Sequence, residues 1–280
     1  KGKALEIGPL RSCEMKVATT LGGCRLRAVT FEITSTLVCM AVPLGQVYGD
    51  SVRHYKLPCP SDDAMKAAFK TAYGKIGTEL PNFGAASSMS ERAWWTRMIE
   101  MTLKEAGCSD ALKPETFPLV FQRIYSSFGS PDVWAPCPEG VRAMRHAKER
   151  SLVVGCVSNV YHRYVDQNLP LLGLHRDLDF ASTSFEVGVT KPDSALFLDA
   201  VRKASHVARL LHGSELPDIS PMEVLHVGDD LKKDYFAAKA AGMQALLYDP
   251  RGAHMSQVLA DDLVRSLDEI PGRIDALLAR

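Results

Sequence analysis

Four short segments of the chain carry side chains suited to acid–base, metal or anion chemistry, and each accompanies an apolar run. They are FEITSTL at 31–37, VSN at 157–159, VTKPD at 189–193 and HVGDDLKKD at 226–234. In a doubly wound parallel sheet, ligands bind at the carboxyl ends of the strands beside a topological switch point. We therefore predict that the four segments meet at one site.

The segment at 226–234 indicates a metal site. Asp229, Asp230 and Asp234 come at the end of a predicted strand and the start of the following helix. Oxygen ligands clustered in this way suit Mg²⁺, so Asp229 and Asp234 are candidate metal ligands. Acidic residues also complement the dipole of a helix in its first turn. That ordinary role explains Asp230, and Asp234 about as well, so Asp229 is the stronger candidate.

The second and third segments offer groups that bind phosphoryl oxygens. Ser158 and Asn159 follow the apolar run VVGCV, which places a hydroxyl and free backbone N–H groups at a strand end. Lys191 precedes Pro192, whose ring restricts the backbone and allows the ammonium to be directed inward as a phosphate clamp. Each pair alone has an ordinary explanation at a helix start. Their combined order along the chain is far more specific.

The apolar runs that position these segments have the pattern of parallel strands. They are LRAVTFEI, LVVGCVSN, DLDFASTSF, VLHVGDD and QALLYD, with helical stretches between them. Strands buried on both faces have this pattern, which predicts an α/β fold with a doubly wound, Rossmann-like parallel sheet. We expect this core at 25–37 and 136–250, after an N-terminal arm at 1–24 and before a C-terminal extension at 251–280 with a terminal helix.

Residues 38–135 have no comparable strand signal and predict an inserted helical cap domain. DAMKAAFKTAYGKIG and SERAWWTRMIEMTLKEAG have helical spacing, and the second helix begins with Ser90 as its N-cap and ends near Gly107. Trp94 and Trp95 on this helix are explained best by packing of the insert against itself and against the sheet domain. Recognition of a substrate is the alternative for this pair.

Composition excludes several classes of protein. The 280 residues suffice for a large core, and 33 basic against 33 acidic residues give no charge excess for binding nucleic acid, although a local RNA contact stays open. Seven cysteines without a C-x-x-C pair indicate reduced thiols in an intracellular protein. No apolar run approaches the roughly 20 residues that span a bilayer, so no membrane partner is expected.

The order of these motifs resembles the haloacid dehalogenase (HAD) superfamily of hydrolases, over about residues 25–250. The WW pair, VSN, KPD and HVGDDLKKDYFAAKAAGM are most similar to the subgroup named haloacid dehalogenase-like hydrolase domain-containing protein 3. The resemblance implies a catalytic aspartate after the first strand, a second aspartate two residues later as general acid and base, and Mg²⁺ held by the nucleophile and the acidic motif. It places Ser158 and Lys191 among the catalytic positions.

The first segment departs from this family at both aspartate positions. Glu32 stands where the nucleophile is expected and Thr34 where the acid/base aspartate is expected. A threonine hydroxyl does not exchange protons near neutral pH, which removes a contribution of about 10²- to 10⁴-fold. The extra methylene of Glu32 moves its carboxylate by roughly 1 Å, and such a displacement can cost about 10²-fold. If a metal is bound, Glu32, Asp229 and Asp234 are its expected ligands.

Three functions are compatible with these departures. The first is a catalytically inactive member, or pseudoenzyme, that serves as a structural or interaction subunit of a larger assembly. The second is a Mg²⁺-dependent hydrolase of a small phosphate ester. The third is a sensor that binds a phosphorylated metabolite through Ser158, Asn159 and Lys191 without chemistry.

The setting of such a subunit is indicated only by the ends and loops of the chain. Residues 1–25 are mildly basic, as behind a transit peptide, which favours a mitochondrial over a cytoplasmic location and a ribosome-like ribonucleoprotein as the assembly. Candidate contact surfaces for other protein subunits are the N-terminal arm, the polar loop 213–221 and the C-terminal helix. Each of these is also explained as an ordinary solvated segment.

Overall fold

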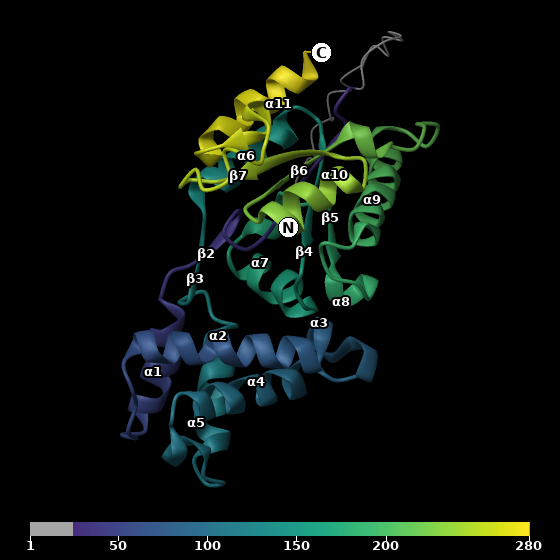
Figure 1. Ribbon diagram of the computed structural model, residues 1–280. Helices are drawn as coiled ribbons and strands as arrows, with labels where there is room; N and C mark the ends of the chain where they lie inside the picture. Colours follow the sequence, from purple (N-terminus) through teal and green to yellow (C-terminus); the bar gives the residue numbers. More distant parts are fainter. Residues whose placement is uncertain (1–24, 280) are drawn as a thin grey trace, which may run out of the picture.

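A six-stranded parallel sheet forms the centre of the computed structural model, which describes residues 25–279 (Figure 1). The predicted N-terminal arm lies outside the described residues. The strands are β1 (Ala28–Phe31), β4 (Val153–Ser158), β5 (Phe180–Thr183), β6 (Val224–Gly228), β7 (Gln244–Tyr248) and β8 (Leu263–Val264). Their order is β5-β4-β1-β6-β7-β8, so the chain reverses its direction of travel at β1. The predicted doubly wound α/β fold is confirmed.

Helices cover both faces of this sheet. One face packs against α6 (Pro138–Glu149) and α11 (Ile270–Leu278), and the other against α9 (Ser194–His212) and α10 (Ala237–Ala240). Side chains of β1 pack on both faces of the sheet: Phe31 belongs to the apolar cluster on the first face, and Ala28 to the cluster on the second. Residues 251–280, predicted as an extension, supply both β8 and α11 to this core.

Short elements connect the larger ones at the edges of the core. They are the π-helical turns Tyr164–Asn168 and Leu231–Phe236, α7 (Leu169–Leu171), α8 (Ser184–Val187) and the 3-10 turns Leu174–Arg176, Pro221–Glu223, Ala260–Asp262 and Leu267–Glu269; a further 3-10 turn, Ser109–Leu112, lies within the inserted helical segment. Among residues 25–279, no helix is long and apolar enough to cross a bilayer.

A helical segment, called the cap here, is inserted between β1 and β4. The chain enters and leaves it through an antiparallel ribbon of β2 (Val38–Met40) and β3 (Trp134–Pro136). The cap helices are α1 (Leu44–His54), α2 (Asp62–Glu79), α3 (Pro81–Gly84), α4 (Glu91–Glu105) and α5 (Phe117–Ser127), with a 3-10 turn at Ala85–Ser87. Figure 1 shows these helices as a separate layer that faces the edge of the sheet where β4 ends.

The cap holds together through its own apolar clusters. Trp94 is only 2 % exposed and packs with Met98, and its indole N–H donates to the carbonyl of Leu80 at 3.1 Å. The Ser90 hydroxyl accepts from the backbone N–H of Ala93 at 3.2 Å, which confirms the predicted N-cap of α4. Packing therefore explains Trp94, whereas its neighbour on α4 has a different position, described below.

Candidate functional site

All the residues predicted for the site line one open hollow of about 310 Å³ at the carboxyl edge of the sheet. They are Glu32, Thr34, Ser158, Asn159, Lys191, Asp229 and Asp234. Glu32 follows β1, Ser158 ends β4 and Asp229 follows β6, and these three strands are neighbours in the sheet. The topological switch at β1 therefore assembles the site from segments that are far apart in the sequence.

The carboxylate of Glu32 is engaged through both of its oxygens. Its Oε1 accepts from the backbone N–H of Ile33 at 2.9 Å, the N–H of Thr34 at 3.0 Å and the hydroxyl of Ser158 at 2.5 Å. Its Oε2 forms an ion pair with the ammonium of Lys191. The side chain is about 10 % exposed. Glu32 thus gathers donors from three separate segments of the chain.

Lys191 lies between two carboxylates and is itself buried. Its Nζ contacts Glu32, lies 2.6 Å from Oδ1 of Asp234, and donates to the carbonyl of Val157 at 3.0 Å. Burial alone would lower the pKa of Lys191, but the two adjacent carboxylates raise the pKa above its ordinary value. Lys191 is therefore an ammonium with all three donors in use.

The second carboxylate of this network, Asp234, is also saturated. Its Oδ1 pairs with Lys191 and its Oδ2 accepts from the backbone N–H of Asp230 at 2.9 Å. Burial acts to raise the pKa of Asp234, but Lys191 and His226 lower it below the ordinary value. Gly228 permits this arrangement, because a Cβ there would lie 2.3 Å from Cγ of Asp234.

Two buried polar residues beneath Asp234 were not predicted from the sequence. Nε2 of His226 lies 3.4 Å from Oδ1 of Asp234, and its Nδ1 lies 3.0 Å from the hydroxyl of Thr30. Burial lowers the pKa of His226, which favours the neutral ring. A neutral ring that donates from Nε2 to Asp234 accepts from Thr30 at Nδ1. A histidine inside the apolar run VLHVG was the available signal.

The remaining predicted residues have less central roles in the structure. Asn159 holds the backbone of Lys191, since its Nδ2 donates to the Lys191 carbonyl at 3.1 Å and its Oδ1 accepts from the Lys191 N–H at 2.7 Å. Asp230 caps the turn that follows β6 by accepting from the N–H groups of Lys232 and Lys233. Thr34 is exposed at the rim of the hollow.

Asp229 differs from the other carboxylates of the hollow. Desolvation and the nearby carboxylates of Asp234 and Glu32 raise the pKa of Asp229 to about 6. It takes no part in the salt bridges that join Lys191 to Glu32 and Asp234. Asp229 is therefore the one predicted metal-site carboxylate of the described chain that is not committed to Lys191.

The three predicted metal ligands do not gather free oxygens around a common point. Glu32 and Asp234 direct their carboxylates at Lys191, and Asp229 makes no salt bridge to that lysine. Within residues 25–279 no group of three or more His, Cys, Asp or Glu side chains is arranged to hold a metal ion. Mg²⁺ requires near-octahedral oxygen geometry, which these side chains do not offer as they lie. A magnesium site stays a prediction from the sequence.

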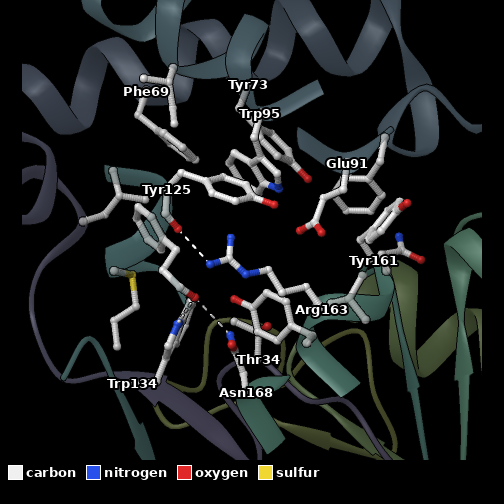
Figure 2. A pocket seen from close by; sticks show the side chains of 18 residues that line it. Thr34, Phe69, Tyr73, Glu91, Trp95, Tyr125, Trp134, Tyr161, Arg163 and Asn168 are labelled. Atoms are coloured by element: carbon white, nitrogen blue, oxygen red, sulfur yellow. Dashed lines mark hydrogen bonds between the residues drawn. The ribbon is translucent and has the colours of Figure 1, made fainter. Parts of the chain in front are cut away.

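A second pocket of about 200 Å³ adjoins the hollow on the side of the cap (Figure 2). Thr34, Tyr73 and Asn159 line both spaces, so one opens beside the other. Trp95 of α4 faces this pocket, in contrast to the buried Trp94. The alternative role considered for the tryptophan pair, contact with a ligand, therefore remains available to Trp95.

A family model described as haloacid dehalogenase-like hydrolase matches residues 26–242. The chain is similar to the bovine haloacid dehalogenase-like hydrolase domain-containing protein 3, at 29 % identity over 223 residues, which cover 80 % of this chain and 82 % of that protein. It is also similar to the rhythmically expressed gene 2 protein of Drosophila melanogaster, at 29 % identity with 86 % and 90 % of the two chains covered.

Solved structures of low sequence identity share the fold. The 2-haloacid dehalogenase of Pseudomonas syringae matches with a TM-score of 0.60 at 22 % identity, and the alignment covers 90 % of this chain and 99 % of that one. A HAD-hydrolase of Bacillus subtilis, whose structure is bound to magnesium, matches with a TM-score of 0.61 at 16 % identity and the same coverage.

Proposed function

The chain belongs to the haloacid dehalogenase-like hydrolase family, and from this premise we propose that it is a member whose hydrolytic step has been lost and whose role lies in binding. Three of the segments that carry the family's chemistry supply Ser158, Lys191 and Asp234 to one hollow. The remaining segment is the loop after β1, where the chain departs from the family at Glu32 and Thr34.

The observation that carries the proposal is the state of the Glu32 carboxylate. It accepts from two backbone N–H groups and from Ser158, and it pairs with Lys191. These groups are the ones suited to hold the oxygens of a phosphoryl substrate. Because the longer side chain of Glu32 already occupies them, an incoming anion would have to displace an internal one.

The residue two positions later supports the same conclusion. Thr34 has no carboxyl group to protonate a leaving group, and general acid–base catalysis contributes about 10²- to 10⁴-fold. Thr34 is exposed at the rim of the hollow and its backbone N–H is used by Glu32. The loop therefore offers neither a free nucleophile nor a proton donor.

We further propose that the retained role is as an interaction subunit of a larger assembly. Leu210 and Leu211, at the end of α9, are 71 % and 55 % exposed, and Met222 is 60 % exposed. These side chains lie on either side of the polar loop 213–221, which supports this loop as a contact surface. Sedimentation of the native protein in extracts, compared with a Leu210→Glu/Leu211→Glu variant, tests this role; unaltered migration as a monomer for both contradicts it.

One observation favours the second candidate, a Mg²⁺-dependent hydrolase. Asp229 keeps a carboxylate free of Lys191 at the same hollow as Ser158 and Asp234. If Glu32 exchanged Lys191 for a substrate, the remaining residues would still surround the reacting group. Slow turnover is the expected property of such an enzyme.

Phosphatase turnover with Mg²⁺ on a generic phosphate ester near neutral pH distinguishes the two candidates. We expect no turnover by the wild type, and the Glu32→Asp and Glu32→Asp/Thr34→Asp variants show whether the loop alone limits the reaction. Wild-type turnover that disappears in Asp229→Asn would overturn the proposal, because it would show that the present loop supports chemistry.

A further inference from the structure

The pocket under the cap has the dimensions and walls of a binding site for a flat ring. Its volume is about 200 Å³. A dry cavity of about 150 Å³ accepts benzene, so this space is sufficient for one or two fused rings. Nine of its lining residues are aromatic: Phe69, Tyr73, Phe83, Trp95, Tyr125, Phe128, Trp134, Tyr161 and Tyr164.

These aromatic side chains come from both parts of the molecule. Tyr73, Trp95 and Tyr125 reach into the pocket from three cap helices, and Tyr161 faces them from the segment after β4 (Figure 2). Trp95 is nearly parallel to Phe128, at 11° between ring planes and 6.4 Å between centroids. Ring faces and edges are thus both presented, which suits stacked and edge-to-face contact with a planar molecule.

Among the described residues, Arg163 is the one arginine that lines the pocket, and its guanidinium already has partners. Nη2 of Arg163 donates to the carbonyl of Tyr125 at 2.9 Å, and its Nε donates to Oε1 of Gln167 at 3.2 Å. The guanidinium also lies over the Tyr125 ring, 4.1 Å from its centroid. Arg163 is therefore held in the wall of the pocket by its neighbours.

Two hydrogen-bond acceptors that line the pocket, on Glu91 and Asn168, have fewer partners than the donors of Arg163. Glu91 lines the pocket and makes no salt bridge within 4.0 Å to a described residue. Burial raises the pKa of Glu91, while Arg163 acts in the opposite direction. Asn168, 3 % exposed, also lines the pocket, and its Oδ1 has no hydrogen-bond partner in the described chain. The lining therefore has acceptor capacity that its own donors do not use.

We propose that this pocket binds a planar aromatic molecule with an N–H donor edge, of the amino-substituted nitrogen heterocycle class to which nucleobases belong. The ring lies among the aromatic side chains and the donors face Glu91. The inference goes beyond the proposed loss of hydrolysis and does not depend on it, because none of these contacts involves Glu32 or Lys191.

Charge in the neighbouring hollow decides what the rest of the ligand can be. Four carboxylates line that hollow against two lysines: Glu32, Asp229, Asp230 and Asp234 against Lys191 and Lys233. A substituent that leaves the pocket past Thr34 enters this negative region. A neutral or cationic ligand is favoured over a phosphorylated one.

Thermal unfolding with adenine tests the proposal, with benzofuran as a ring of similar size that has no N–H donor. We expect saturating adenine to raise the Tm by about 2–4 °C and benzofuran to have a smaller effect. Glu91→Gln should weaken adenine binding about tenfold, since a hydrogen bond to a charged group is lost. Glu100→Gln, an exposed glutamate on the same helix, is the matched control and should bind as the wild type does.

Two further variants separate loss of binding from loss of folding. Trp95→Leu removes an aromatic ring on the cap side of the pocket, and Tyr161→Leu removes one on the core side. Each substitution should abolish the increase in Tm with adenine while unfolding remains cooperative. Absence of any shift with adenine in the wild type, or equal adenine affinity in Glu91→Gln, would overturn the inference.

The two proposals of loss of hydrolysis and of ring binding fail separately. If Glu32 occupies the anion donors, adenosine monophosphate should bind no more tightly than adenosine. Tighter binding of the monophosphate would contradict the proposed state of Glu32 and leave ring binding intact.

Discussion

The polar hollow at the strand ends and the aromatic pocket under the cap share three residues but differ in how their charges are satisfied. In the hollow, Lys191 pairs with both Glu32 and Asp234, and His226 lies behind Asp234. In the pocket, Glu91 has no ion pair with a described residue. The difference teaches that two adjoining spaces in one molecule can differ in whether their charged side chains are paired, and the proposed loss of hydrolysis concerns only the hollow.

The largest expected effect comes from removing the central cation of the hollow. Lys191→Met leaves Glu32 and Asp234 buried without a positive partner, and breaking a buried ion pair from one side costs about 3–5 kcal/mol. Urea unfolding should show this loss. Lys233→Met, at an exposed lysine of the same hollow, is the control and should change stability by less than about 0.5 kcal/mol. Equal effects of the two variants would contradict a closed network.

Removing one anion should cost less than removing the shared cation. In Glu32→Gln, Lys191 keeps Asp234 as its partner, so we expect a loss of about 1.5–3 kcal/mol, the range for a hydrogen bond to a charged group. The ratio of this loss to that of Lys191→Met measures how much of the stabilisation that Lys191 provides comes from its pair with Glu32. A greater loss in Glu32→Gln than in Lys191→Met would show that Asp234 does not hold the lysine.

A smaller effect is expected at the hydroxyl that supports Glu32. Ser158→Ala removes one of three donors to Oε1, and the backbone N–H groups of Ile33 and Thr34 remain. We predict a loss of about 1 kcal/mol by the same unfolding measurement. No loss at all would indicate that Ser158 is not a partner of Glu32.

In the aromatic pocket, substitution of the carboxylate should stabilise the protein, whereas the substitutions in the hollow should destabilise it. The pKa of Glu91 is raised by burial, so the ionised form is disfavoured in the folded state, and stability falls as pH rises from the ordinary glutamate pKa to the raised pKa of the folded state. Glu91→Gln should therefore raise the Tm at pH 7.5, and the gain should vanish below about pH 4, where glutamate is protonated in both states. Thermal unfolding at the two pH values checks this, with Glu100→Gln expected to show no such dependence.

The fold and the convergence of the site could be predicted because both follow from local patterns. Continuous apolar runs separated by helices require a parallel sheet, and a parallel sheet brings the residues after its strands to one edge. This places Glu32, Ser158 and Asp229 together without knowledge of any long-range contact. The cap was predictable for the complementary reason, a long stretch of helical spacing without strands.

The partners of each side chain could not be predicted in the same way. Asn159 was interpreted as a phosphate ligand, yet it holds the backbone of Lys191, which lies 32 residues further along the chain. Nothing in the sequence pairs Glu91 or Tyr161 with Trp95, because the aromatic pocket depends on how cap and core face one another. Contacts between separate layers are set by packing, which a local pattern does not record.

The occupation of the anion donors by Glu32 is tested most directly by titrating inorganic phosphate into the wild type and into Glu32→Ala by calorimetry. Removal of the carboxylate frees Ser158, Lys191 and two backbone N–H groups. We predict no measurable phosphate binding by the wild type and clear binding by Glu32→Ala. Phosphate binding by the wild type that equals or exceeds that of the variant would contradict the proposed loss of the hydrolytic site.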